Sequence, residues 1–269
     1  AVVSVSTGCL EVSTTIYPYT AWKDSMIHSA FENAGATISG VETAYNSLKK
    51  QGKIKDDMYF VAFGGDGGTY DIGLQSLSGA VERGHNFVFV CYDNGAYMNT
   101  GFQRSSATPR GAWTTTSPVG KDAAGKQQNR KDLTAIMVAH DIPYAATASP
   151  HNFKDLMTKA EKAFATPGPA FLNVISPCPR GWRTPGDQSI ALAKEAVQSC
   201  YWPLYEVENG KYKINYKPKG DKKTPVADWL KKQGRFAHLF KPGNEAVLVD
   251  IQDYIDRKWE ELLKKEACL

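Results

Sequence analysis

The chain has 269 residues, 42% of them hydrophobic, so it is long enough to bury a sizeable core in one large or two small domains. A formal net charge of +4 is too small to indicate a nucleic-acid partner. No apolar run approaches the ~18 residues of a membrane helix, and no signal peptide is recognisable, so we expect a soluble, cytoplasmic protein.

The N-terminal part of the chain predicts a strand and then a long helix. The first residues, AVVSVSTGC, begin without methionine inside a strand-like run, and we expect the natural chain to continue upstream. The segment from Asp24 to Tyr45 carries small residues that would let a helix approach another element closely. On that helix His28 and Glu32 would share a face, because they are four residues apart. We interpret His28 as an interface residue rather than a catalytic one.

Two apolar runs, FVAFGG and FVFVCYD, predict buried strands that end in polar turns. Asp66 follows the first run and Asn94 follows the second. The stretch between them, YDIGLQSLSGAVERG, ends at Gly84 and predicts one crossover helix between parallel strands. Its apolar side chains are Ile72, Leu74, Leu77 and Val81.

Asp66 and Asn94 are candidate ligands of a divalent metal, because open α/β sheets bind ligands at the carboxyl ends of their strands. A carboxylate and an amide oxygen suit such a metal. Gly65 and Gly67 are small enough to let the backbone approach a diphosphate. After Asn94, the polar loop of residues 100–106 suits either turn chemistry or cofactor contact.

From Asp132 onward the chain repeats the order of strand, helix and strand, with Pro167-Gly168-Pro169 before the last strand. This alternation predicts an α/β fold with a doubly wound, mostly parallel sheet over residues 1–208. Residues 209–269 are expected to form a C-terminal extension that packs on this domain or on a partner subunit.

The extension has two parts. Residues 209–223 hold six lysines and an Asn-Gly turn, which predicts a short edge strand or hairpin protected by its charges. Docking of an acidic partner protein is the functional alternative to a solvated basic face. Apolar residues at helical spacing predict a final helix: Ile251, Tyr254, Ile255, Trp259, Leu262 and Leu263.

Five cysteines are present: Cys9, Cys91, Cys178, Cys200 and Cys268. A reducing cytosol makes disulfides unexpected. Small buried side chains are the ordinary fate of free cysteine, and we assign Cys91 to the core because it lies inside an apolar strand. Cys200 and Cys268 are expected to be structural or surface thiols.

Six motifs in order make the chain resemble the β subunit of 2-oxoacid:ferredoxin oxidoreductases, over roughly residues 3–210. Within them, the Gly-Asp-Gly triplet and Asn94 resemble the signature of thiamine diphosphate enzymes. The motifs are TGC, WKDSMIHSAFENAGATISGVE, GDGGTYDIGLQSLSGAVERG, YDNGAYMNTGFQRSSATPRGA, PGPAFLNVISPCPRGWR and YWPLYEVENG.

The resemblance implies roles for individual residues. It implies that Gly65, Asp66, Gly67, Asn94 and Thr100 bind thiamine diphosphate. It makes Asp66, Asn94 and the carbonyl of Ala96 ligands of Mg²⁺, and it places Asn99 near the thiazolium and the substrate as the catalytic residue. Cys9 and Cys178 would be two of four thiolates that hold a [4Fe–4S] cluster. The other two thiolates are expected from a missing upstream C-x-x-C segment.

The implied function is oxidative cleavage of a small 2-oxoacid, with release of CO₂ and transfer of single electrons through the cluster to ferredoxin. Cofactor activation would need a glutamate from the pyrimidine-binding domain of a partner subunit, so this chain is expected to be half an active site. Partner subunits would also carry further iron–sulfur clusters. We expect no nucleic-acid or membrane partner.

The substrate stays open between oxalate and pyruvate. Many pyruvate-type relatives have a glutamate after the Asp-Asn pair, whereas this chain has Gly95, and a missing carboxylate would suit the dianion oxalate. Two other functions also stay open. One is a non-oxidative thiamine diphosphate decarboxylase or synthase subunit, which would not need Cys9 and Cys178. The other is a non-catalytic nucleotide-binding scaffold.

Overall fold

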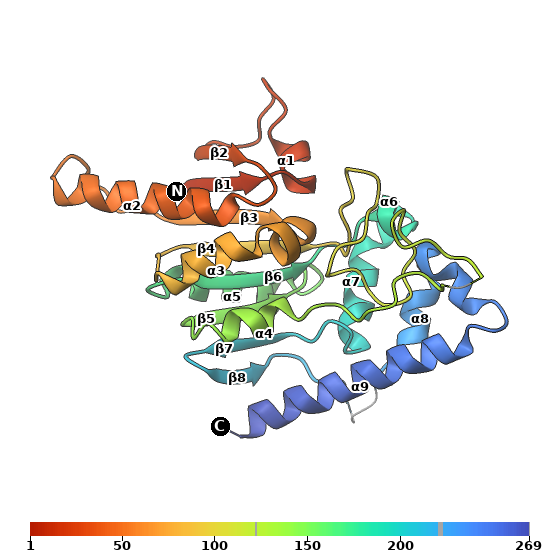
Figure 1. The fold of residues 1–269 in the computed structure, drawn as a ribbon. Coiled ribbons are helices and arrows are strands. Elements are labelled where there is room, and N and C mark those ends of the chain that lie inside the picture. Colours follow the sequence, from red (N-terminus) through yellow and green to blue (C-terminus); the bar gives the residue numbers. More distant parts are fainter. Residues whose placement is uncertain (122, 220–222, 269) are drawn as a thin grey trace.

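A computed structural model of the chain describes residues 1–121, 123–219 and 223–268 (Figure 1). Its centre is an eight-stranded sheet in the order β2-β1-β3-β4-β6-β5-β7-β8. The strands are β1 (Val2–Ser6), β2 (Ser25–Ser29), β3 (Phe60–Gly65), β4 (Val88–Asp93), β5 (Tyr144–Ala148), β6 (Ala170–Ile175), β7 (Tyr205–Glu208) and β8 (Lys211–Ile214).

Helices lie on both faces of the sheet and beyond its end (Figure 1). The α-helices are α1 (Cys9–Thr14), α2 (Ala34–Lys50), α3 (Leu74–Glu82), α4 (Leu133–Val138), α5 (Phe153–Ala165), α6 (Pro179–Trp182), α7 (Ser189–Gln198), α8 (Val226–Lys231) and α9 (Glu245–Ala267). Shorter helical turns are the π-helix η1 (Gly68–Ile72) and the 3₁₀ helices η2 (Gly186–Gln188) and η4 (Gly234–Phe240).

The sheet confirms the predicted α/β class. Strands β1 to β6 pair in parallel, while β7 and β8 pair antiparallel at one edge. Side chains alternate between the two faces, as a pleated strand requires. On β4, Phe89 and Cys91 pack with residues of α2, α3 and α4, whereas Val88 packs with Ala163 of α5. Both faces are therefore buried, as in doubly wound folds.

The predicted helix from Asp24 to Tyr45 is wrong in its first part. Residues 25–29 form β2, which pairs in parallel with β1, and α2 begins only at Ala34. Hydrogen bonding to β1 decides the structure of this stretch, which sequence periodicity does not report. His28 lies on this exposed edge strand and Glu32 lies in the following turn, so the two share no helical face.

The predicted crossover helix exists but is interrupted. The π-helical turn η1 precedes α3, and Gly73 stands between them. A π-turn adds a residue to the helical repeat and rotates the side chains that follow. Tyr70 is thereby fully buried, whereas Ile72, one of the apolar side chains of the expected helix, is 60% exposed. Leu77 and Val81, two others of that set, are buried.

The C-terminal elements continue the main sheet. Asn209 and Gly210, with φ of 50° and 79°, form the predicted tight turn between β7 and β8. The expected boundary between residues 208 and 209 therefore falls inside a hairpin. Lys222 of the predicted basic segment lies outside the described residues. The predicted final helix is α9, and Ile251, Ile255, Trp259 and Leu262 are its buried residues.

The described helices include none that is both long enough and apolar enough to cross a membrane.

Candidate functional site

Asp66 and Asn94 meet at the carboxyl ends of adjacent strands. Because β3 and β4 are parallel neighbours, the residues that follow them emerge at the same edge of the sheet. The backbone N–H of Asn94 donates to Asp66 Oδ1 at 3.2 Å. Asp66 and Asn94 are 1% and 4% exposed. The structure thus brings together the two side chains that the sequence predicts as metal ligands.

Three oxygen atoms converge at this point. Asn94 Oδ1 lies 2.9 Å from Asp66 Oδ1 and 2.8 Å from the carbonyl oxygen of Ala96. In this orientation the Asn94 amide nitrogen donates to Cys9 Sγ at 3.5 Å, and Oδ1 accepts from Ala96 N at 3.4 Å. Three oxygen acceptors in contact repel one another. Rotation of the Asn94 amide would remove this repulsion by placing its nitrogen at the same point, and a cation among the oxygens would remove it as well. Oxygen ligands of these kinds fit Mg²⁺.

The described residues contain no group of three or more His, Cys, Asp or Glu side chains that could hold a metal ion. The predicted magnesium set has only one carboxylate. An amide and a backbone carbonyl would complete it, as in many sites for hard cations.

The Asp66 carboxylate is held in a dry environment. Burial, and the nearby charge of Asp93, raise the pKa of Asp66, while hydrogen bonds from Ser105 Oγ and from the Asn94 N–H oppose the rise. A buried carboxylate is unfavourable without a compensating positive charge. A cation bound by Asp66 would supply that compensation. Ser105 was one of the loop residues for which the sequence favoured no role.

The Gly-Asp-Gly glycines have a packing requirement of their own. A Cβ at Gly67 would lie 2.4 Å from the ring of Tyr97, and the Tyr97 hydroxyl donates to the Gly67 carbonyl at 2.7 Å. A Cβ at Gly65 would lie 3.3 Å from the ring of Tyr92. The glycines therefore allow two aromatic rings to close over the turn that carries Asp66.

The cleft beside this turn has a volume of about 30 Å³. Asn99 and Thr100, both exposed, line it together with Cys9 and Asp66. The Tyr92 hydroxyl also lies there, buried and without a hydrogen-bond partner in the described part of the chain. Sequence reasoning missed Tyr92 because it stands inside an apolar strand.

Cys9 and Cys178 both adjoin the Asn94 site. Cys178 Sγ accepts from the Gly181 N–H at 3.4 Å at the start of α6, and Trp182 of that helix donates to the Asn94 carbonyl at 2.7 Å. Burial, followed by the charges of Cys178 and Asp66, raises the pKa of the Cys9 thiol to about 11. Both thiols are half-buried, so neither is locked in the core.

The other cysteines take ordinary positions. Cys91 is fully buried and Cys200 is 5% exposed. Cys268 is exposed at the C-terminal end of the described chain. The sequence interpretation of Cys91 as a core residue is confirmed.

Gly95 has a positive φ of 78°, and a Cβ there would lie 3.1 Å from Arg235 Nη1. L-residues with side chains rarely adopt this conformation. The backbone conformation at position 95 therefore explains the presence of glycine there without reference to substrate charge.

Behind the site, Arg130 connects the two turns. Its Nη2 donates to Asp93 Oδ2 at 2.6 Å and to the Tyr70 hydroxyl at 2.7 Å, and Tyr70 donates to the same Asp93 oxygen at 2.6 Å. Tyr70 belongs to η1, which follows Asp66, and Asp93 immediately precedes Asn94. The network thus ties together the two turns that carry the candidate metal ligands. No local sequence signal marked Arg130.

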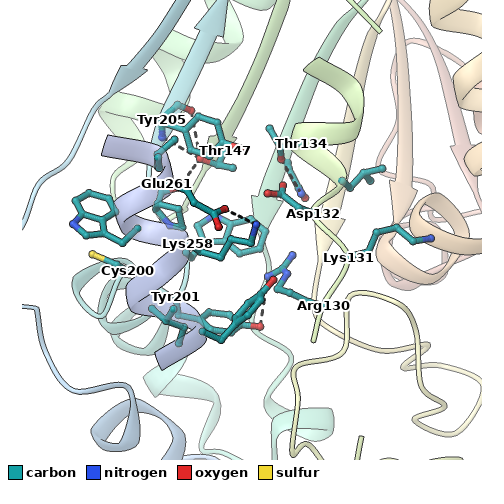
Figure 2. Close-up of a pocket in the computed structure, with 18 of the residues that line it drawn as sticks. Arg130, Lys131, Asp132, Thr134, Thr147, Cys200, Tyr201, Tyr205, Lys258 and Glu261 are labelled. Atoms are coloured by element: carbon teal, nitrogen blue, oxygen red, sulfur yellow. Dashed lines mark hydrogen bonds and ion pairs between the residues drawn. The ribbon is translucent and has the colours of Figure 1, made fainter. Parts of the chain in front are cut away.

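A second and larger cavity of about 130 Å³ lies on the other side of Arg130, beside α9 (Figure 2). Tyr70 and Arg130 line this cavity, whereas Asp66 and Asn94 do not.

Comparison with known proteins places this site in a family. Residues 6–174 match the model of the thiamine pyrophosphate enzyme C-terminal TPP-binding domain, a range that includes Cys9, Asp66 and Asn94. Pyruvate synthase subunit PorB of Thermotoga maritima is 55% identical over 98% of this chain and 82% of its own. Ketoisovalerate oxidoreductase subunit VorB of Pyrococcus horikoshii is 47% identical over 98% of this chain and 83% of its own.

The chain belongs to the β subunits of the 2-oxoacid:ferredoxin oxidoreductases. The resemblance predicted from the motifs is thereby confirmed, and thiamine diphosphate is the cofactor that this family's domain binds. A structure of 2-oxoglutarate:ferredoxin oxidoreductase from Magnetococcus marinus matches with a TM-score of 0.55 at 23% identity, over 72% of this β subunit and 66% of that chain. This likeness supports the fold.

Proposed function

We propose that this β subunit binds thiamine diphosphate and Mg²⁺ at the Asp66–Asn94 turns and takes part in the oxidative cleavage of pyruvate. The observation that carries the proposal is the meeting of the Asp66 carboxylate, the Asn94 side-chain amide and the Ala96 carbonyl beside a cleft that Cys9 also lines. The names of the PorB relatives support pyruvate as the substrate, while the name of the VorB relative supports a branched 2-oxoacid.

Asp66, Asn94 and the Ala96 carbonyl would hold the metal, and the turn that follows Gly65 would face the diphosphate. When bound, thiamine diphosphate supplies the nucleophilic carbon and the electron sink for cleavage of the 2-oxoacid. The protein contributes position and electrostatics. Asp66 would offset part of the metal's positive charge, and the closed packing of Tyr92 and Tyr97 on the glycines would keep the turn rigid.

Asn99 and Thr100 would contact the cofactor ring and the substrate from the open side of the cleft. Both residues are exposed, so they present their polar groups to whatever covers this edge of the sheet. A partner subunit that carries the pyrimidine-binding domain would cover it and complete the active site. The β subunit would then be inactive alone.

Cys9 and Cys178 would supply two of the four thiolates of a [4Fe–4S] cluster, with the other two from an upstream segment. Asn94 contacts Cys9 directly and contacts Cys178 through α6. This proximity supports transfer of single electrons from the cofactor to the cluster, and then to ferredoxin. A non-oxidative thiamine diphosphate enzyme would have no use for two thiols at this place.

Calorimetric titration of thiamine diphosphate and Mg²⁺ into the purified complex tests the metal assignment. We expect Asp66→Ala to abolish cofactor binding, because the metal loses its only carboxylate ligand. Asn94→Ala should weaken binding less, since an amide carries no charge. Micromolar affinity in the Asp66→Ala variant would refute the assignment.

Iron analysis and viologen reduction test the electron path. We expect Cys178→Ser to lower cluster iron and to stop viologen reduction while cofactor binding persists. Cys91→Ser is the matched control, because it changes a thiol on the neighbouring strand that lies in the core. Equal iron in the wild type and the Cys178→Ser variant would remove Cys178 from the ligand set.

A further inference from the structure

The two oxygens of the Asp66 carboxylate have different neighbours. Oδ1 faces the side chain of Asn94 and accepts from the Asn94 backbone N–H at 3.2 Å. Oδ2 accepts from the Ser105 hydroxyl at 2.5 Å. Asp66 and Ser105 are each 1% exposed, so water does not compete for this hydrogen bond. The other candidate ligand oxygens therefore adjoin Oδ1, while Oδ2 is engaged by a hydroxyl group.

Ser105 is held in place by the second of the two turns. Its backbone N–H donates to Thr108 Oγ1 at 2.9 Å, and Thr108 Oγ1 in turn donates to the Gly95 carbonyl at 2.7 Å. Thr108 is fully buried. Gly95 stands between Asn94 and Ala96 in the sequence. The hydroxyl that engages Asp66 is thus fixed relative to the turn that carries the remaining candidate ligands.

A buried lysine holds the same loop through its backbone. Lys126 is 2% exposed, and its Nζ donates to the carbonyls of Ser106 at 3.1 Å and Thr108 at 2.6 Å. A buried ammonium that lost these carbonyls would keep its charge without hydrogen bonds, which is strongly unfavourable. The loop therefore resists a shift that would move Ser105 away from Asp66.

A carboxylate restricted in this way distinguishes between divalent cations. Mg²⁺ requires octahedral geometry with short bonds and takes few protein carboxylate oxygens, whereas Ca²⁺ takes six to eight oxygens and accepts both oxygens of one carboxylate. A cation that used both Asp66 oxygens would have to displace the Ser105 hydroxyl from Oδ2. The smaller cation has no need of that displacement.

We propose that Ser105 is a positioning residue that limits Asp66 to one metal-binding oxygen and thereby makes the site prefer Mg²⁺ to Ca²⁺. This inference rests on the proposed function, in which Asp66 binds the metal together with thiamine diphosphate. Ser105 acts through Asp66 and is not itself a ligand. Hydrogen-bond partners of metal ligands commonly change metal affinity by about 10- to 100-fold when they are removed.

Two calorimetric titrations test the proposal, one with Mg²⁺ and one with Ca²⁺. Each uses the purified complex, dialysed free of divalent metal and saturated with thiamine diphosphate. We expect Ser105→Ala to weaken Mg²⁺ binding about tenfold, because the carboxylate is no longer oriented. Ca²⁺ binding should change by less than about twofold, because the freed Oδ2 gives this cation a second oxygen. The preference for Mg²⁺ should therefore fall at least fivefold.

Matched variants separate this effect from a general disturbance of the loop. Ser106→Ala is the control, since the Ser106 hydroxyl donates to Asp71, a carboxylate outside the candidate ligand set; neither affinity should change. Ser105→Thr keeps the hydroxyl and should retain most of the preference. Thr108→Val removes the hydroxyl that links Ser105 to Gly95 and should lower the preference in part. Thermal unfolding of each variant shows that it is folded.

The two affinities distinguish the possible failures. Equal weakening of Mg²⁺ and Ca²⁺ in Ser105→Ala would show a purely structural role and overturn the proposal, as would an unchanged Mg²⁺ affinity. The proposed function fails separately if the wild-type complex with thiamine diphosphate binds Mg²⁺ no better than the Asp66→Ala variant does. That result would refute the metal assignment and the role of Ser105 together.

Discussion

Replacing Arg130 with methionine should destabilise the chain more than any surface change. Asp93 is 3% exposed, and its Oδ2 accepts from Arg130 at 2.6 Å. The Arg130 side chain is only 16% exposed, so solvent screens this pair little. Removing one partner of a buried ion pair costs about 3–5 kcal/mol, because the remaining charge stays buried. For a chain of this size, that loss lowers the melting temperature by roughly 6–20 °C.

Differential scanning calorimetry of the full chain measures this loss, and a titration with thiamine diphosphate and Mg²⁺ measures its effect on the site. We expect weaker cofactor binding as well, because Arg130 connects Tyr70 and Asp93, and these residues flank the turns of Asp66 and Asn94.

Two controls separate a buried charge from simple loss of contacts. The double variant Arg130→Met, Asp93→Asn should recover part of the stability, because no unpaired charge remains. Arg110→Met breaks an exposed pair with Asp250, in which the side chains are 30% and 53% exposed, and should cost less than about 1 kcal/mol. The reasoning is refuted if Arg130→Met unfolds within 2 °C of the wild type, or if the double variant is less stable than the single one.

Three further outcomes follow from the packing and the titrating groups. Gly67→Ala should cost about 1–3 kcal/mol and weaken cofactor binding, because its Cβ would meet the Tyr97 ring at 2.4 Å; calorimetry measures both. Burial alone would raise the pKa of Glu206, but hydrogen bonds from Lys162, Tyr144 and Asn215 lower it to about 2. The Glu206→Gln variant should therefore be less stable than the wild type at pH 7. That deficit should disappear in urea melts as the pH falls from about 4.5 to 2. Burial lowers the pKa of Lys126 from 10.5 to about 8. As the pH rises from about 8 to 10.5, the stability of the wild type should therefore increase relative to that of Lys126→Met in the same melts.

The parts of the fold that the sequence predicted are those in which a local pattern decides the structure. The apolar runs before Asp66 and Asn94 are strands because both sheet faces are buried there, and the Asn209-Gly210 turn needs the positive φ that these residues tolerate. Edge strand β2 could not be predicted in this way. Its side chains are mostly exposed, and its pairing partner β1 lies about twenty residues earlier in the chain.

The candidate site divides in the same way. Asp66 and Asn94 were predicted because each stands at the end of a recognisable strand. Tyr92 and Arg130 were not, because their roles depend on contacts between segments that are far apart in the sequence. Arg130 reaches Asp93 across 37 positions, and Asn173 reaches Tyr70 across 103. Residues that support a site without lining it show no fixed spacing in the sequence from the residues they contact. Any segment of the chain that packs against the site can supply them.

Gly95 shows how far a single departure from a family pattern can be interpreted. The sequence favoured a link between the absent glutamate and a dianionic substrate, but Gly95 has a φ of 78°, and its Cβ direction meets Arg235 at 3.1 Å. A glutamate placed there would be strained by about 1–3 kcal/mol, and the adjacent guanidinium would partly neutralise its charge. The glycine at position 95 is therefore explained by the geometry of the turn and gives no independent evidence about the substrate. On the proposed function, substrate charge would instead be read by groups that face the cleft at Asn99 and Thr100, where a covering subunit would contribute the other half of the pocket.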